Sequence, residues 1–170
     1  SKGLDKNRLL VAEGCGVDGE LEGGFERAIA CAKDADVVSL ALGEDSNMSG
    51  EAASRTNIAI PAVQHRLAEE IVKLGKPTAL VLVNGRPLVL DWFERNVGAI
   101  VETWFLGSQA GHAIADVMFG DYNPSGKLTM SFPQHAGQVP IYYNHFNTGR
   151  PVTPENKHMK YISKYLDSPN

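Results

Sequence analysis

The sequence has 170 residues, 43% of them hydrophobic, which is enough to bury one sizeable core and favours a single domain over two. Its 16 basic and 20 acidic residues give a formal net charge of -4, so there is no electrostatic reason to expect a nucleic acid or an anionic membrane as a partner. The longest apolar run, residues 79–83, is far shorter than the roughly 20 residues of a membrane-spanning helix. We therefore expect a neutral partner.

Helices and strands are predicted to alternate along the first two thirds of the chain. Apolar side chains at helical spacing predict a helix over residues 24–35, and a β-branched and aliphatic run predicts a buried strand over 36–45. A helix over 61–75, strands over 76–85 and 98–105 and a helix over 110–120 follow. Such alternation predicts an α/β fold, a three-layer sandwich with a mostly parallel sheet and helices on both faces.

Three segments fit this alternation less well. Residues 127–133 alternate in polarity and end at a proline, so we expect one antiparallel edge strand there. Residues 8–13 have the composition of a short strand but no clear partner. From about His135 onward the sequence has neither helical nor strand periodicity, which is typical of a connector that packs on a neighbouring domain.

Two glycine-rich segments resemble phosphate-binding motifs. Gly14–Gly19 satisfies G-x-G-x-x-G, but five residues separate it from the next helix, so a turn is favoured over a dinucleotide site. The segment from Gly120 to Lys127 is one residue too long for a P-loop and precedes a strand, which argues against that motif.

The cysteines and histidines give no clear functional signal. The two cysteines, Cys15 and Cys31, match no metal or redox spacing, and structural packing is favoured for them, although a disulfide stays open. The five histidines show no metal-ligand spacing either. We therefore expect no metal and no cofactor.

The loop EDSNMSGEAASRTNIAIP follows the carboxyl end of the first buried strand, where open α/β sheets place their ligand sites. It carries three carboxylates, Glu44, Asp45 and Glu51, together with Arg55. Two interpretations follow from composition: a solvated acidic loop, or a loop that presents a carboxyl group to a substrate. Composition alone favours the first.

Several strings of this sequence, in this order and spacing, resemble the second domain of glycoside hydrolase family 3 β-glucosidases of the bacterial periplasmic type. They are SGEAASRT, IAIPAVQ, VLVNGRPL, ETWFLGSQAGHAIADVMFGDYNPSGKLTMSFP and PIYYNHFNTGRP. The resemblance covers roughly residues 35–167, and its specificity comes from the succession of motifs, since no single motif would suffice.

The resemblance implies a retaining glycosidase in which Glu51 of the SGE string is the general acid/base. Ser49 and Arg55 match the same motif as possible supporting residues, Arg55 either orienting the loop or making a structural salt bridge. Residues 84–87 and 104–107 match segments that face the barrel in this family, which suits domain docking. The family's nucleophile is an aspartate of a preceding (β/α)₈ barrel, which does not fit within this chain.

The resemblance also sets the expected domain boundaries and partners. Residues 1–140 would form the α/β sandwich domain, and residues 141–170 a connector toward a fibronectin-like domain. The expected partners are a β-glucoside or oligosaccharide substrate and the barrel of the same enzyme, with no nucleic acid and no membrane. The expected location of the protein is the periplasm or the cell exterior. The alternative is an α/β nucleotide- or sugar-binding module without catalysis.

Overall fold

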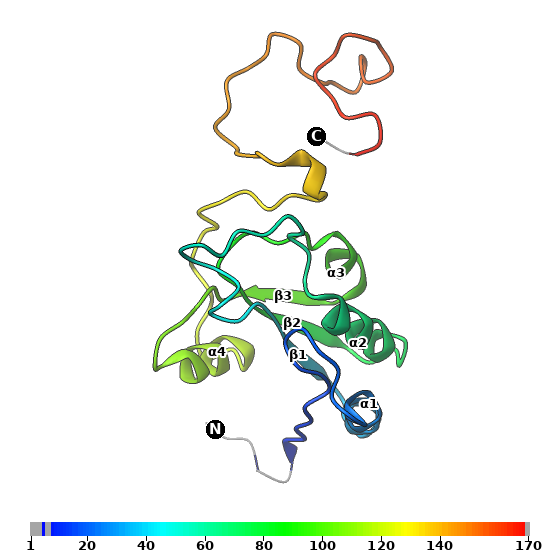
Figure 1. Ribbon diagram of the computed structural model, residues 1–170, viewed down its shortest axis with the longest axis vertical. Helices are drawn as coiled ribbons and strands as arrows, with labels where there is room; N and C mark the ends of the chain where they lie inside the picture. The colour runs from blue at the N-terminus through cyan, green and yellow to red at the C-terminus, as the bar shows by residue number, and fades with distance from the viewer. Residues whose placement is uncertain (1–4, 6–7, 169–170) are drawn as a thin grey trace.

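The computed structural model describes residue 5 and residues 8–168, which contain three strands, four α-helices and a short 3₁₀ helix (Figure 1). In chain order the elements are α1 (Gly24–Asp34), β1 (Val38–Gly43), α2 (Ala62–Val72), β2 (Thr78–Val83), α3 (Asp91–Asn96), β3 (Ala99–Glu102), α4 (Ala110–Met118) and η2 (Ala136–Gln138). The α/β alternation predicted from the sequence is thus confirmed. In addition, α3 is a helix of 6 residues, too short for a periodic pattern to reveal.

The three strands form one parallel sheet in the order β1-β2-β3. Val38 of β1 lies opposite Thr78 of β2, and Ala79 lies opposite Ala99 of β3. Because all three strands are parallel, their carboxyl ends meet at one edge of the sheet, so the loops that follow them lie together.

The core lies mainly between the sheet and helices α1 and α2. Leu80 and Leu82 of β2, Ala68 of α2 and Leu88 are fully buried, and Phe93 of α3 packs with them. The helices α1 and α2 pack on each other, and α2 packs on β1. In Figure 1, α4 lies apart from these helices, and none of its residues is buried.

The expected antiparallel edge strand is wrong: residues 127–133 form no strand. Alternation identifies a segment with one apolar face but does not supply a neighbouring strand to receive its hydrogen bonds. Leu128 and Met130 are 61% and 55% exposed, whereas Pro133 is buried and Phe132 packs against the core, where its ring lies 5.8 Å from that of Trp104.

Residues 9–13 also form no strand, because no sheet edge receives them. The free edge of β1 is covered by a side chain instead. The side chain of Gln64 accepts a hydrogen bond from the Gly43 N–H at 2.7 Å and donates to the Gly43 C=O at 2.8 Å. It also donates to the Val17 C=O at 2.6 Å. One buried amide therefore takes the place of a neighbouring strand at this position.

Within the described part, residues 141–168 contain turns and bends but no helix or strand. In Figure 1 this orange and red segment lies apart from the sheet. Tyr143, Phe146, Tyr161 and Leu166 are each more than four-fifths exposed. No helix in the described part of the chain is both long enough and apolar enough to cross a membrane.

Candidate active site

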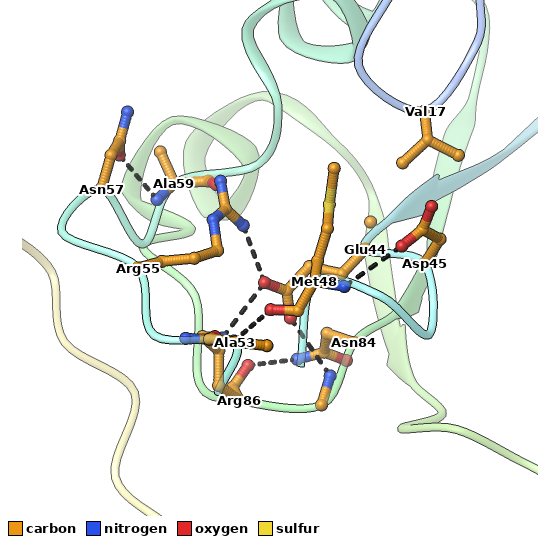
Figure 2. Close-up of polar contacts among 12 residues, drawn as sticks. Val17, Glu44, Asp45, Met48, Ala53, Arg55, Asn57, Ala59, Asn84 and Arg86 are labelled. Atoms are coloured by element: carbon orange, nitrogen blue, oxygen red, sulfur yellow. Dashed lines mark hydrogen bonds and ion pairs between the residues drawn. The ribbon is translucent and has the colours of Figure 1, made fainter. Parts of the chain in front are cut away.

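The loops that follow β1 and β2 meet at the carboxyl edge of the sheet (Figure 2). We call residues 45–59, between β1 and the segment leading into α2, the β1 loop. The two loops also run together briefly as a parallel bridge between Ala59 and Val89. The sequence predicted a site in this loop, and the structure places the loop beside the turn after β2.

Glu44, directly after β1, is the buried charge of this edge: its side chain is fully inaccessible to solvent. Its carboxylate forms ion pairs with Arg55, at 2.7 Å from Oε1 to Nη1, and with Arg86, at 3.1 Å from Oε1 to Nε. The N–H of Gly85 donates a hydrogen bond to Oε2 at 3.2 Å. Two cations and a backbone donor thus compensate the desolvated carboxylate, as a buried charge requires.

The two arginines in turn donate to carbonyl groups of the β1 loop. Arg86 Nη2 donates to the carbonyl of Met48 and, at 2.7 Å, to that of Ala53. Arg55 Nη2 donates to the carbonyl of Ala59 at 3.4 Å. The loop is therefore attached on both sides of residues 49–52, and Figure 2 shows Arg55 and Arg86 reaching the Glu44 carboxylate from different directions.

Glu51 lies between those attachment points and is exposed. Its neighbours both have positive φ angles, 118° for Gly50 and 57° for Ala52, so the backbone turns sharply around it. Within the described residues, no hydrogen bond or ion pair involves its carboxylate. This arrangement presents a free carboxyl group on a loop whose two sides are fixed.

Ser49 lies against the turn after β2. A Cβ atom added to Gly85 would come within 2.1 Å of Ser49 Oγ and 2.7 Å of Phe105 Cε2, so this contact requires glycine at position 85. Arg55, the other predicted supporting residue, is half-buried and bonded to Glu44. The structure thus brings both residues to the base of the loop.

A further carboxyl group, Glu102, ends β3 at the same edge. Its Oε1 accepts a hydrogen bond from the Trp104 N–H at 2.9 Å, and its Oε2 is buried without a hydrogen-bond partner. Burial raises the pKa of Glu102, while hydrogen bonds from the Trp104 backbone and the Asn84 side chain act in the opposite direction. Trp104 itself has a φ of 53°.

The glycine motif and the cysteines singled out in the sequence have structural roles that need no ligand. Gly14–Gly19 forms a turn in which the Gly16 N–H donates to the Gly19 C=O at 2.8 Å, and α1 begins only at Gly24. Cys15 and Cys31 are free thiols, and burial, followed by the charge of Glu13, raises the pKa of Cys15. Among the described residues, no group of three or more potential ligands could hold a metal ion.

The family to which the chain belongs is shown by its match to a known domain family. The Glycosyl hydrolase family 3 C-terminal domain matches residues 6–165, nearly the whole sequence. The chain belongs to this family. As a family 3 C-terminal domain it is part of a group of glycoside hydrolases that includes β-glucosidases and β-xylosidases.

Individual family 3 relatives support the same conclusion. The periplasmic β-glucosidase of Salmonella typhimurium is 54% identical over 146 residues, 86% of this chain and 19% of that protein. The β-xylosidase of Formosa agariphila is 47% identical over 136 residues, 80% of this chain and 19% of that protein. The crystal structure of a Listeria innocua β-glucosidase bound to glucose is 47% identical, with a TM-score of 0.86 over 91% of this chain and 21% of that one. The chain spans about a fifth of the length of these relatives.

Sequence reasoning missed the residues that hold the β1 loop in place. It identified Glu44 only as one of three loop carboxylates, and it assigned Arg86 to a segment suited to domain docking. In the structure Arg86 turns into the domain, and 20% of its side chain is exposed. The available signal was positional: an acid directly after one buried strand and an arginine just after the next strand must meet when the strands are parallel.

Proposed function

We propose that this chain is the domain of a retaining β-glucosidase that supplies the general acid/base, Glu51, for hydrolysis of terminal β-D-glucosyl residues of glucosides or oligosaccharides. The observation that carries this proposal is an exposed glutamate at the carboxyl edge of the sheet, on a loop fixed at both sides, in a family 3 domain; in the described part of the chain its carboxylate has no hydrogen bond or ion pair. Relatives that are named β-glucosidases, including one whose structure holds glucose, support it.

In the proposed reaction, Glu51 donates a proton to the glycosidic oxygen as the bond to the anomeric carbon breaks. An aspartate of a barrel domain, outside this chain, forms a bond to that carbon. Water then attacks the anomeric carbon, the bond from that carbon to the aspartate breaks and releases the carboxylate, and a proton of the water passes to Glu51, which returns to its acid form. Ser49 and Arg55 support the loop and take no part in these proton transfers.

The proposal includes a partner and a location. The barrel of the same enzyme would cover the exposed face of the β1 loop, residues 1–140 would form the sandwich domain, and residues 141–170 would connect it to a fibronectin-like domain. No cofactor takes part. The periplasm or the cell exterior fits the periplasmic name of the Salmonella typhimurium relative.

The test compares Glu51→Gly with the parent in this chain joined to a family 3 barrel, using aryl β-glucosides and β-xylosides of differing leaving-group acidity. General acid–base catalysis contributes roughly 10²–10⁴-fold, so we expect losses in this range on poor leaving groups. Azide, which attacks the intermediate without base assistance, should restore turnover on good leaving groups. Glu13→Gly, which removes another exposed carboxylate outside any helix, serves as the control.

Unchanged hydrolysis of poor leaving groups by Glu51→Gly would contradict the assignment. The alternative, a binding module, makes a different prediction: NAD, ATP or a free sugar would raise the melting temperature of the chain by mass action. We expect neither nucleotide to change it. A response to NAD or ATP would favour a nucleotide-binding function.

A further inference from the structure

The strongest unexplained feature of the molecule is its buried Glu44. A fully desolvated carboxylate is costly unless charges and hydrogen bonds compensate it, and an ion pair of this kind often adds little stability compared with an apolar replacement. A buried charge therefore suggests a role in geometry more than in stability. The contacts of its two partners indicate which geometry: Arg55, itself a residue of the β1 loop, and Arg86, from the turn after β2, both donate to carbonyl groups of that loop.

Arg86 carries most of this connection. Through Nε it faces Glu44, and through Nη2 it reaches one loop carbonyl before Glu51 and another after it, those of Met48 and Ala53. Arg86 Nε makes no hydrogen bond within the described residues, so the attraction of Glu44 acts on it as an ion pair. Because a guanidinium group is planar and rigid, holding its Nε beside the carboxylate also sets the direction of its other donors. The orientation of Arg86, and with it the position of both sides of the Glu51 turn, thus depends on Glu44.

We infer that Glu44 is a positioning residue for the acid/base: its buried carboxylate orients Arg86 and Arg55, and these set where Glu51 stands. This inference rests on the proposed function of Glu51. Glu44 is itself excluded as the acid by its surroundings, because both oxygens are occupied by donors and its side chain has no access to a substrate.

The predicted consequence is specific to proton transfer. Misplacing a reacting group by about 1 Å can cost roughly 10²-fold in rate. In the chain joined to a family 3 barrel, Glu44→Gln should therefore lower hydrolysis of poor leaving groups by at least about tenfold. Hydrolysis of activated aryl glucosides should fall much less, and azide should accelerate it, as for Glu51→Gly. Inhibition by gluconolactone should stay unchanged.

Two further variants separate positioning from general destabilisation. Ile71→Val shortens a buried side chain of α2 and should lower the melting temperature without any dependence on the leaving group or on azide. Arg86→Lys keeps the charge, but its single ammonium nitrogen replaces both Nε, which faces Glu44, and Nη2, which donates to the carbonyls of Met48 and Ala53. This variant should reproduce the Glu44→Gln pattern if Glu44→Gln fails to fold. Hydrogen exchange of amides in residues 46–54 should accelerate in the Glu44 and Arg86 variants but not in Ile71→Val.

Three outcomes would overturn the inference. The first is an equal loss on all leaving groups without azide rescue, and the second is unchanged hydrogen exchange in the β1 loop. The third is full activity of Glu44→Gln on poor leaving groups while Glu51→Gly loses it, which would leave the proposed function intact. If Glu51→Gly itself has no effect, the proposed function fails, and the assignment of Glu44 fails with it.

Discussion

The clearest test of the fold concerns Gln64, whose side chain stands in for a strand at the free edge of β1. Gln64→Leu preserves volume and helix propensity but removes three hydrogen bonds, two to Gly43 and one to Val17. A pocket of about 190 Å³ beside these groups admits water, so each loss should cost near the ordinary net value. At about 1 kcal/mol per bond, the free energy of unfolding should fall by about 3 kcal/mol.

Urea denaturation followed by far-UV circular dichroism measures this change directly, with the slope checked for constancy. The melting temperature should fall by about 6–12 °C, given roughly 2–4 °C per kcal/mol for a domain of this size. Gln109→Leu, at an exposed glutamine whose side chain makes no cap hydrogen bond, is the matched control and should be close to neutral. A loss below about 1 kcal/mol for Gln64→Leu would refute the view that this amide replaces a strand.

Three other variants test separate features of the domain. Gly43→Ala places a Cβ 1.8 Å from the Val83 carbonyl oxygen at a φ of 140°, so it should lose about 3 kcal/mol or more and give no parental thermal transition. Glu102→Gln removes a carboxyl group whose folded-state pKa is raised. The parental chain therefore loses stability as the pH rises from 4.5, the group's ordinary pKa, through the raised pKa of the folded state, whereas the glutamine variant does not. The variant should melt at a higher temperature than the parent at neutral pH, and this difference should vanish below pH 4.5. Glu20→Ala breaks an exposed ion pair with Arg66, and its denaturation midpoint should equal the parental one within error.

The elements with strong periodicity were predictable because one physical pattern decides each of them. Helix α1 and strands β1 and β2 follow from apolar spacing and composition alone, and their ends fall within two residues of the expected ranges, although burial alternates along β1. The strand prediction for residues 127–133 was wrong because alternation in polarity describes a single segment, whereas a strand forms only when a neighbouring strand pairs with it. Here the segment meets no sheet edge, and Leu128 and Met130 stay exposed.

The site was predictable in place but not in its contacts. The position of the β1 loop follows from the rule that parallel strands gather their carboxyl ends at one edge. That Arg86 would reach Met48 and Ala53, 38 and 33 residues earlier in the chain, depends on side-chain directions across two loops. Periodicity carries no information about such directions, and the family resemblance placed Arg86 only within residues 84–87, a segment that suits domain docking.

The need of the β1 loop carbonyl groups for hydrogen-bond donors explains why this edge contains a buried charge instead of apolar packing. The β1 loop has no helix or strand, so the carbonyls of Met48, Ala53 and Ala59 find no partner within regular structure. Guanidinium groups can donate to several such carbonyls at once, but a buried guanidinium needs an anion beside it. Glu44 is that anion, and it follows β1 directly, where the sheet fixes its backbone through the bond from its N–H to the Val83 carbonyl. An irregular loop that must hold a carboxyl group in one place thus requires the two arginines, and the arginines require the buried glutamate.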